Sequence, residues 1–541
     1  MIKSKKLAIV TSVAIATFSG QSFAIVDGWD FSGDSARNEA MNADYWNSRD
    51  NYNVWVNPAY VTKYKNFADL NISDGVRDDE MAGVFKELGS SGTWGFYIGR
   101  PSEPGNVDIN PSNFGFGFNQ LTDFSATNSG ATGAIPDRTP TIEEPRSQFD
   151  LFWAKSFGAI GEFGVRLNTQ LLDGDSSASP ATARTPNTFQ LTDGAAQFNT
   201  VSVDQNSFSS SDINLSFGWV SNSGQFDAAF LIGMPSRSGD ARLVDQLIDE
   251  GLNGVDGTVV SRQTTDFDGT EKVDDDGMQN LGFAIRGDFG GVLTAFSYST
   301  RDRSLSSVVN GVTRFQDDTN ADGTNETDTT TSFTQDGVSD GDSDELRLSA
   351  SKVFPVSAGS NIFGSIGLVS QTGKTHSVNT QITNSVTDNL AGTTTYPVTG
   401  CGPNSNSANP CLGTQTNVIF EGETLTLPLV IAAEGKVSES FTVRGSISKN
   451  LYESIENETT TRGFALPTTA DATDNTTATQ QISVVTTKVD TSRAWDTDTT
   501  FSLGMGYKKD NFVVDLTLLK EFVTEGIDTP LTSRINATWM F

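Results

Sequence analysis

The sequence predicts an all-β protein, a closed antiparallel transmembrane β-barrel of about 16 strands, with about 14 strands as the alternative. Three observations carry this prediction. Segments of roughly ten residues alternate apolar and polar side chains, as a strand with one apolar face requires. Very short turns join these segments in pairs, and long polar stretches separate the pairs. The chain ends on such a segment, Leu531–Phe541, whose apolar side chains share one face.

The expected strands begin with three weaker candidates, within Asn66–Asp74, Met81–Leu88 and Thr93–Arg100. Six hairpins follow, and the segment that ends at Phe541 completes the barrel. The hairpins lie in Phe149–Leu172, Ile213–Gly233, Leu281–Thr300, Glu345–Ser370, Leu425–Tyr452 and Phe501–Phe522.

The connections alternate between very short and very long. Turns such as Ser223-Gly224 and Gly290-Gly291 are short, whereas the connections between hairpins are long. This asymmetry is typical of membrane barrels and predicts short periplasmic turns and long extracellular loops. The expected loops are residues 101–147, 173–211, 235–279, 302–344, 373–424 and 453–499.

A soluble β-sandwich and a β-helix are the alternatives to a membrane barrel. A sandwich would not place short and long connections so regularly at opposite ends, and a β-helix would show a constant short repeat. Strands in hydrocarbon cannot leave edge groups unpaired, so the sheet must close on itself. A barrel of about sixteen strands would enclose a lumen wide enough for water.

The N-terminus reads as a signal peptide, residues 1–24. Lys3, Lys5 and Lys6 precede the short apolar run Leu7–Thr17, and Ser22–Ala24 fits a small-x-small cleavage site. After this segment we expect no transmembrane helix, because no run of about 20 apolar residues remains. The expected organisation is therefore an export signal, an N-terminal segment over residues 25–65 and a barrel over residues 66–541.

The signal peptide, the aromatic-rich alternating strands and the terminal Phe541 together resemble the Gram-negative outer-membrane barrel class. The resemblance covers Asn66–Phe541. It implies an outer-membrane location, with lipid and lipopolysaccharide as surroundings. It also implies that the barrel-assembly machinery reads the terminal pattern of Trp539 and Phe541.

Composition excludes some functions. The formal net charge is -31, from 67 acidic and 36 basic residues, which argues against nucleic acid as a partner. The only histidine, His376, adjoins Ser377, but adjacent residues on a strand point to opposite faces. Without a nucleophile motif or a phosphate-binding loop, the protein is expected not to be an enzyme.

Alternation assigns charged side chains to the lumen, because a charge that faces lipid at mid-depth costs about 2–4 kcal/mol. Four arginines are expected about four to seven residues from the short-turn end, at one level. Two interpretations stay open: a constriction that sorts solutes by charge, and charges that only brace a polar interior. In the first, changing Arg166 and Arg444 to Ser raises cation preference and leaves folding intact. The four are Arg166, Arg347, Arg444 and Arg534, and the other pore-lining candidates are Arg286, Asp150, Asp227, Glu345, Glu434 and Asp515.

The N-terminal segment carries a second resemblance. Asn57, Pro58 and Ala59 resemble the asparagine-proline-alanine segment that precedes the first strand in the long-chain fatty-acid transporter family. The resemblance implies a plug inside a barrel of fourteen strands. A periplasmic extension that ends in a proline turn is the alternative.

Two sites are expected in the outer loops. Cys401 and Cys411 lie in a loop rich in Gly, Pro, Asn and Ser, which in an exported protein favours a local disulfide over a zinc pair. Asp318, Asn320, Asp322 and Glu326 resemble the opening of a calcium loop, although Thr329 stands where such a loop carries its bidentate Glu. No other cofactor is expected.

The function expected first is a porin, a channel for passive diffusion of small hydrophilic solutes and ions. One alternative is a plugged transporter of hydrophobic substrates that resembles the fatty-acid family. Another is a surface barrel whose loops serve adhesion or structure. A homotrimer is an open alternative for its assembly.

Overall fold

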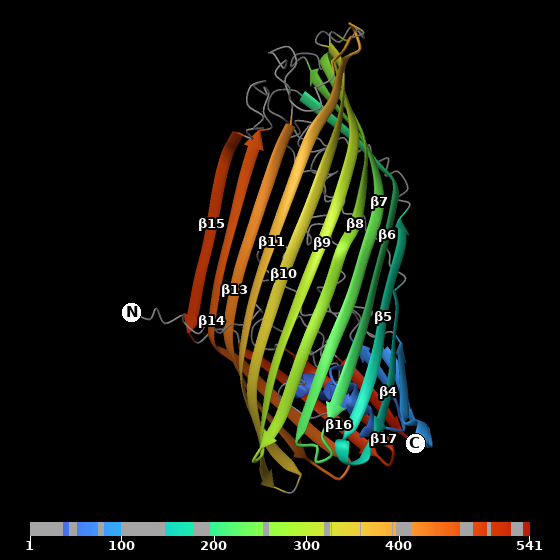
Figure 1. The fold of residues 1–541 in the computed structure, drawn as a ribbon, viewed down its shortest axis with the longest axis vertical. Coiled ribbons are helices and arrows are strands. Elements are labelled where there is room, and N and C mark those ends of the chain that lie inside the picture. The colour runs from blue at the N-terminus through green and yellow to red at the C-terminus, as the bar shows by residue number, and fades with distance from the viewer. Residues whose placement is uncertain are drawn as a thin grey trace.

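The computed structural model describes residues 36–42, 51–73, 81–98, 146–176, 195–252, 259–318, 325, 327–357, 359–391, 393–395, 413–465, 480–494, 499–520 and 534–541. Their 18 strands form one antiparallel sheet that closes on itself (Figure 1). Closure occurs at β1 (Phe67–Ser73), which pairs both with β2 (Met81–Glu87) and with β18 (Arg534–Met540).

Sixteen strand positions surround the barrel, as predicted. β12 (Thr393–Thr395) only extends the sheet beside β11, and β15 (Gln480–Ala494) and β16 (Thr499–Lys509) both pair with β14 as two parts of one position. Removing β12 and counting β15 and β16 together reduces 18 to 16. The remaining strands are β3 (Thr93–Ile98), β4 (Arg146–Ser156), β5 (Glu162–Ser176), β6 (Ala195–Val220), β7 (Phe226–Leu252), β8 (Val259–Phe289), β9 (Val292–Asp318), β10 (Thr327–Ser357), β11 (Ser360–Asp388), β13 (Gly413–Lys436), β14 (Phe441–Ala465) and β17 (Phe512–Lys520).

Short turns gather at the end of the barrel that also holds the C-terminus (Figure 1). Two of them contain 3-10 helices, η4 (Gly89–Ser91) and η6 (Gly158–Ile160). The Trp153 indole N–H donates to the Ser91 carbonyl at 2.9 Å, and the Trp219 indole N–H donates to the Ile160 carbonyl at 3.0 Å. Tryptophan is thus placed at the interface depth that amphipathic rings prefer in membrane barrels.

The C-terminal strand completes the wall at this end. The Phe541 amide donates to the Asn66 carbonyl at 2.9 Å, and the Lys86 ammonium lies 4.6 Å from the Phe541 ring centroid. The Trp539 and Phe541 rings meet edge to face with centroids 6.0 Å apart. Recognition of these two residues by the assembly machinery stays a prediction.

The strands are much longer on one wall than on the other. β8 and β10 each contain 31 residues, whereas β1, β2 and β18 contain 7 each. The prediction of long loops is corrected here, because residues 235–252 and 259–279, expected as loop, are the outer parts of β7 and β8. A strand of that length spans roughly 100 Å, well beyond the roughly 25 Å apolar band of a bilayer.

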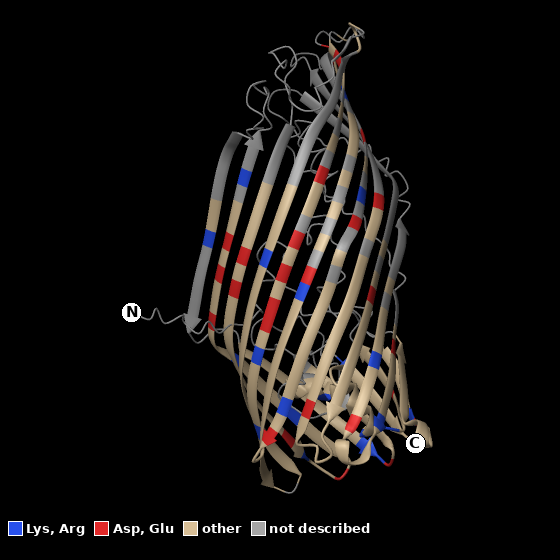
Figure 2. Ribbon diagram, viewed as in Figure 1, with Lys and Arg blue, Asp and Glu red and all other residues tan. Residues whose placement is uncertain are grey.

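Acidic residues are frequent along the middle of the long strands (Figure 2), and the outward face changes character along them. Near the short turns it carries exposed apolar side chains such as Leu348, Ile366 and Ile431. On β10 the outward face becomes acidic at Asp344, thirteen residues before the strand ends at Ser357. With about 3.3 Å per residue and a strand tilt of about 40°, Asp344 lies roughly 30 Å above that end along the barrel axis. The apolar belt therefore matches the bilayer, and the charged continuation of the sheet lies beyond it. Among the described residues, no helix is long and apolar enough to cross a membrane.

The N-terminal residues lie inside the barrel. The helix α1 (Ala36–Met41) contacts β14, β16 and β17. The 3-10 helix η3 (Pro58–Thr62) lies against β3 to β6, and η2 (Asn51–Trp55) packs beside η3. The main apolar cluster is therefore inside the lumen, where buried residues of η2 and η3 pack against inward rings of β1 to β4. It contains Val54, Trp55, Ala59, Tyr60, Val61, Phe67, Phe85, Tyr97 and Phe152.

A polar network fixes the outer tips of β9, β10 and β11. The Arg314 guanidinium donates to both carboxylate oxygens of Asp328, at 2.9 and 2.6 Å, and the Asn389 side-chain amide donates at 2.7 Å. The Asn389 backbone amide donates to the Asp328 carbonyl at 2.8 Å. Hydrogen bonds from Arg314, with those of Asn389 and Gln316, hold the pKa of Asp328 well below its ordinary 3.8.

Because the folded pKa of Asp328 is depressed, its stabilising contribution is complete above pH 3.8 and is lost as the pH falls below that value. Hydrogen exchange at residues 387–391, corrected for intrinsic rates, is expected to be constant between about pH 7 and pH 5 and to rise below about pH 4. Asp328→Asn should raise exchange already at neutral pH. Asp336→Asn, on an exposed part of β10, is the control, and equal exchange in both variants would contradict the prediction.

Candidate functional site inside the barrel

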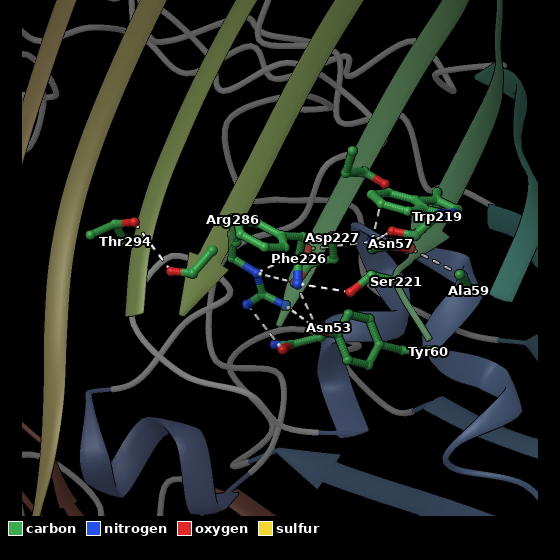
Figure 3. Close-up of polar contacts among 12 residues, drawn as sticks. Asn53, Asn57, Ala59, Tyr60, Trp219, Ser221, Phe226, Asp227, Arg286 and Thr294 are labelled. Atoms are coloured by element: carbon green, nitrogen blue, oxygen red, sulfur yellow. Dashed lines mark hydrogen bonds and ion pairs between the residues drawn. The ribbon is translucent and has the colours of Figure 1, made fainter. Parts of the chain in front are cut away.

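Asn57 fixes the turn between η2 and η3 onto the inner wall (Figure 3). Its Oδ1 accepts the Ala59 amide at 3.1 Å, which caps η3, while Pro58 occupies the first helical turn, where a missing N–H costs nothing. Its Nδ2 donates to the carbonyls of Trp219 and Ala228, both at 3.1 Å. One side chain therefore shapes the turn and binds it to β6 and β7.

Two glycines make room for this turn. Gly164 on β5 and Gly218 on β6 are cross-strand partners, and both face inward. A Cβ at Gly164 would lie 2.3 Å from the Pro58 carbonyl carbon, and a Cβ at Gly218 would lie 2.0 Å from Asn57 Oδ1. No other residue type leaves the backbone bare enough for so close an approach.

A buried ion pair joins β7 and β8 to the same turn (Figure 3). Arg286 Nε donates to Asp227 Oδ1 and Oδ2 at 3.1 and 3.2 Å, and both side chains are fully buried. The Tyr60 hydroxyl donates to Asp227 Oδ2 at 2.8 Å and accepts from Arg286 Nη2 at 3.0 Å. Arg286 Nη1 donates to Asn53 Oδ1 at 3.2 Å. The charges thus hold residues 51–65, called the inner segment below, to the wall.

A second buried pair holds the inner segment from β4 and β5. Arg166 Nε donates to Asp150 Oδ1 at 2.8 Å, and Nη1 donates to the Trp55 carbonyl at 2.7 Å. The Arg166 guanidinium lies 5.2 Å from the Trp55 ring centroid and 5.8 Å from that of Phe152, within cation–π range. Neither Arg166 nor Asp150 is exposed to solvent.

The opposite wall binds α1. Arg444 on β14 pairs with Asp515 and, at 2.6 Å, with Glu434, which also accepts from Arg37 of α1 at 3.2 Å. The Thr517 hydroxyl donates to the Ala36 carbonyl at 2.8 Å. N-terminal residues therefore contact both sides of the lumen.

The other predicted pore-lining residues lie apart from the inner segment. Arg347 pairs with Glu345 at 3.3 Å, ten residues before Ser357, the last residue of β10. That is farther from the short turns than the expected four to seven residues, because β10 extends to Ser357 through further apolar residues, among them Val353 and Val356. Arg534 is the first residue of β18 and pairs in register with Thr517 and Ser73.

Most residues of the predicted loop sites lie outside the described residues. Asp318 ends β9, but Asn320, Asp322 and Glu326 lie outside the described residues, as do Cys401 and Cys411. Within the described ranges, no group of three or more His, Cys, Asp or Glu is placed to hold a metal ion. His376 lies 3.1 Å from the Asn417 side-chain oxygen.

Sequence reasoning missed Asn53, Trp55 and Tyr60 as partners of the inward charges. It also missed Gly164 and Gly218, although a signal was present. An inward glycine within an alternating strand marks close approach of another backbone, and these two interrupt the polar inner faces of neighbouring strands.

No protein-family model matches the chain, and no curated protein matches it. The similar solved structures include the P. aeruginosa FpvA bound to heterologous pyoverdines, at 8% identity and a TM-score of 0.22, covering 88% of this chain and 71% of that one. The E. coli K12 ferric-catecholate import receptor Fiu has 8% identity and a TM-score of 0.22, and the match covers 92% of this chain and 83% of that one. The Neisseria meningitidis FrpB iron transporter has 9% identity and a TM-score of 0.20, and the match covers 90% of this chain and 83% of that one.

The fold and its setting follow from the barrel itself. Near the short turns the strand pairing closes the sheet into a ring, through β1 with β2 and β18, as a bilayer demands of spanning strands. Apolar side chains cover its outer face over a height that fits a bilayer, and buried charges lie within. The chain is an outer-membrane β-barrel of Gram-negative type.

Proposed function

We propose that this protein is a plugged outer-membrane transporter of small hydrophilic solutes, in which the inner segment closes the lumen near the short-turn end. The observation that carries the proposal is the burial of Asn53 to Tyr60 against β5 to β8. This segment is anchored by two buried ion pairs and by the Asn57 hydrogen bonds. A segment held by so many desolvated contacts acts as part of the wall.

An open porin fits this interior less well. A selectivity constriction presents its charges to passing ions. Arg166 and Arg286 are instead fully buried, and each is committed to an acid and to the inner segment. These pairs favour bracing of the interior over charge sorting.

A hydrophobic substrate also fits less well. Farther from the short turns than the inner segment, the inner faces of β5 to β9 carry polar side chains where an acyl chain would need apolar ones. They include Asn168, Asn214, Asn280, Ser297, Ser299 and Arg301. This lining supports hydrophilic solutes.

The test displaces the inner segment without touching its residues. Gly218→Ala adds a methyl group that would lie 2.0 Å from Asn57 Oδ1, so the turn must move. We expect the wild type to conduct weakly in planar bilayers, and Gly218→Ala and Gly164→Ala to conduct several-fold more because the lumen opens.

The control is Gly445→Ala, the same change on β14, where the nearest atom would be 3.4 Å from the new Cβ. It should conduct like wild type, and heat-modifiable mobility should show all three variants folded. Wild-type conductance in folded Gly218→Ala would show that the inner segment is not the barrier.

A further inference from the structure

A row of amide side chains crosses the inner wall just beyond the inner segment. Asp150, Asn168, Asn214, Gly233 and Asn280 are successive cross-strand partners on β4 to β8. The four side chains are 0–3% exposed. Because each is the register partner of the next, they form one continuous ladder of hydrogen-bonding groups.

The ladder has a direction. Asn168 Nδ2 donates to Asp150 Oδ1 at 3.0 Å, and Asn214 Nδ2 donates to Asn168 Oδ1 at 3.1 Å. Each donor thus points back toward the carboxylate that Arg166 neutralises. The far end is Asn214 Oδ1, an acceptor that has no hydrogen-bond partner among the described residues.

Asn280 stands next in the row with both of its amide atoms uncommitted. Its side chain is 0% exposed, and neither Oδ1 nor Nδ2 has a hydrogen-bond partner within the part of the chain that the structure describes. Between them, a Cβ at Gly233 would lie 2.4 Å from Asn214 Oδ1 and 3.1 Å from Asn280 Nδ2. Both amides therefore reach toward the same stretch of bare backbone.

Such a cluster needs an explanation, because buried polar atoms are almost always paired and an orphaned one is costly. The free groups are two acceptor oxygens, Asn214 Oδ1 and Asn280 Oδ1, and the Nδ2 donor of Asn280. A hydroxyl group both donates and accepts, so neighbouring hydroxyls on one molecule can satisfy all three. The charged side chains nearby are already engaged. Asp150 and Arg166 neutralise each other, and Arg301, the register partner of Asn280 on β9, has an interaction of its own.

We propose that Asn214 and Asn280 form a binding subsite for an uncharged, hydroxyl-rich solute of the sugar or polyol class. The subsite deepens the proposed transport function by naming its solute class. Ordered water is the competing occupant, because it also donates and accepts. Saturable binding of a solute separates the two.

The experiment measures binding of glucose to the full-length protein in detergent micelles by isothermal titration calorimetry. Gluconate and glucosamine, of similar size and hydroxyl content but opposite charge, are the comparison probes. We expect saturable glucose binding, at least tenfold weaker binding of both charged probes, and at least a tenfold loss of glucose affinity in Asn280→Leu. Asn417→Leu, on β13 beside His376, is the control and should bind as wild type does.

A second readout keeps the result clear if Asn280→Leu folds poorly. Asn280→Ser keeps a hydroxyl and should retain intermediate affinity, and glucose should raise the unfolding midpoint of wild type but not of Asn280→Leu. Absence of saturable glucose binding, equal affinity in Asn280→Leu, or stronger binding of a charged probe would each overturn the proposal. Binding in micelles does not depend on passage, so unchanged conductance in Gly218→Ala would refute the plug without affecting this result.

Discussion

Replacing Asp227 with Asn is expected to destabilise the protein by about 3–5 kcal/mol, because it leaves the buried Arg286 without its counter-charge. Asp227 accepts from Arg286 Nε and from the Tyr60 hydroxyl, and both charges are fully buried. An asparagine is nearly the same size but presents an N–H₂ group toward these donors. Urea unfolding in detergent micelles, followed by tryptophan fluorescence, measures the loss, and the conductance should rise because the inner segment loses an anchor.

Two comparisons make this result specific. Asp302→Asn removes an exposed carboxylate on β9 and should change stability by no more than about 0.5 kcal/mol. The double variant Asp227→Leu with Arg286→Met removes both charges and should recover most of the lost stability. It should still conduct more than wild type, because Asn53 and Tyr60 have lost their partners. A stable, weakly conducting Asp227→Asn protein would contradict the anchoring role.

The sequence predicted the barrel and the inward side of its charges because of a constraint that lipid imposes. A side chain that faces hydrocarbon must be apolar, so alternate residues are marked as outer, and the rest follow by parity. Arg166 lies between the apolar residues Val165 and Leu167, and the structure places it on the inner face. The predicted number of about 16 strands agrees with the 16 positions of the closed sheet.

The length of the strands could not be predicted by the same reasoning. Beyond the bilayer both faces of the sheet meet water, so the outer face no longer has to be apolar and the alternation disappears. Alternate residues of β10 face outward. Within the membrane this face carries Leu348, and farther out it carries Asp344, Asp342 and Asp340. The backbone ladder with β11 nevertheless continues through all of these residues. Sequence analysis assigns a polar strand of this kind to a loop, because backbone hydrogen bonds between strands do not require any particular residue composition.

Contacts of the inner segment were also beyond sequence reasoning. Asn57 lies more than a hundred residues from Gly164 and Gly218 in the chain, and nothing in the spacing of these residues indicates that they meet. The alternation of side chains along β8 shows that Arg286 faces the lumen. It does not show whether the guanidinium contacts water, an acid or Asn53 there. The same lumen-facing arginines were therefore compatible with a charge-sorting constriction and with internal anchors.

Arg166→Ser and Arg444→Ser are expected to differ, although alternation alone predicted that both would raise cation preference and leave folding intact. Arg166 is fully buried between Trp55 and Phe152, and its loss removes the guanidinium that binds the Asp150 carboxylate and the Trp55 carbonyl. We expect this change to cost about 3–5 kcal/mol and to raise conductance. The current should favour cations, because Asp150 then faces the opened lumen without its counter-charge.

Arg444→Ser is the matched change on the opposite wall. Glu434 keeps its contact with Arg37, at 3.2 Å, so one acid stays paired and a smaller loss of about 1.5–3 kcal/mol is expected. The inner segment does not touch Arg444 in any contact of the described residues, so conductance should stay at the wild-type level. Urea unfolding and reversal potentials in a salt gradient measure both variants side by side. If the two gave the same stability loss and the same reversal potential, Arg166 would be an ordinary lumen charge, and the inner segment would be held by something other than its buried pairs.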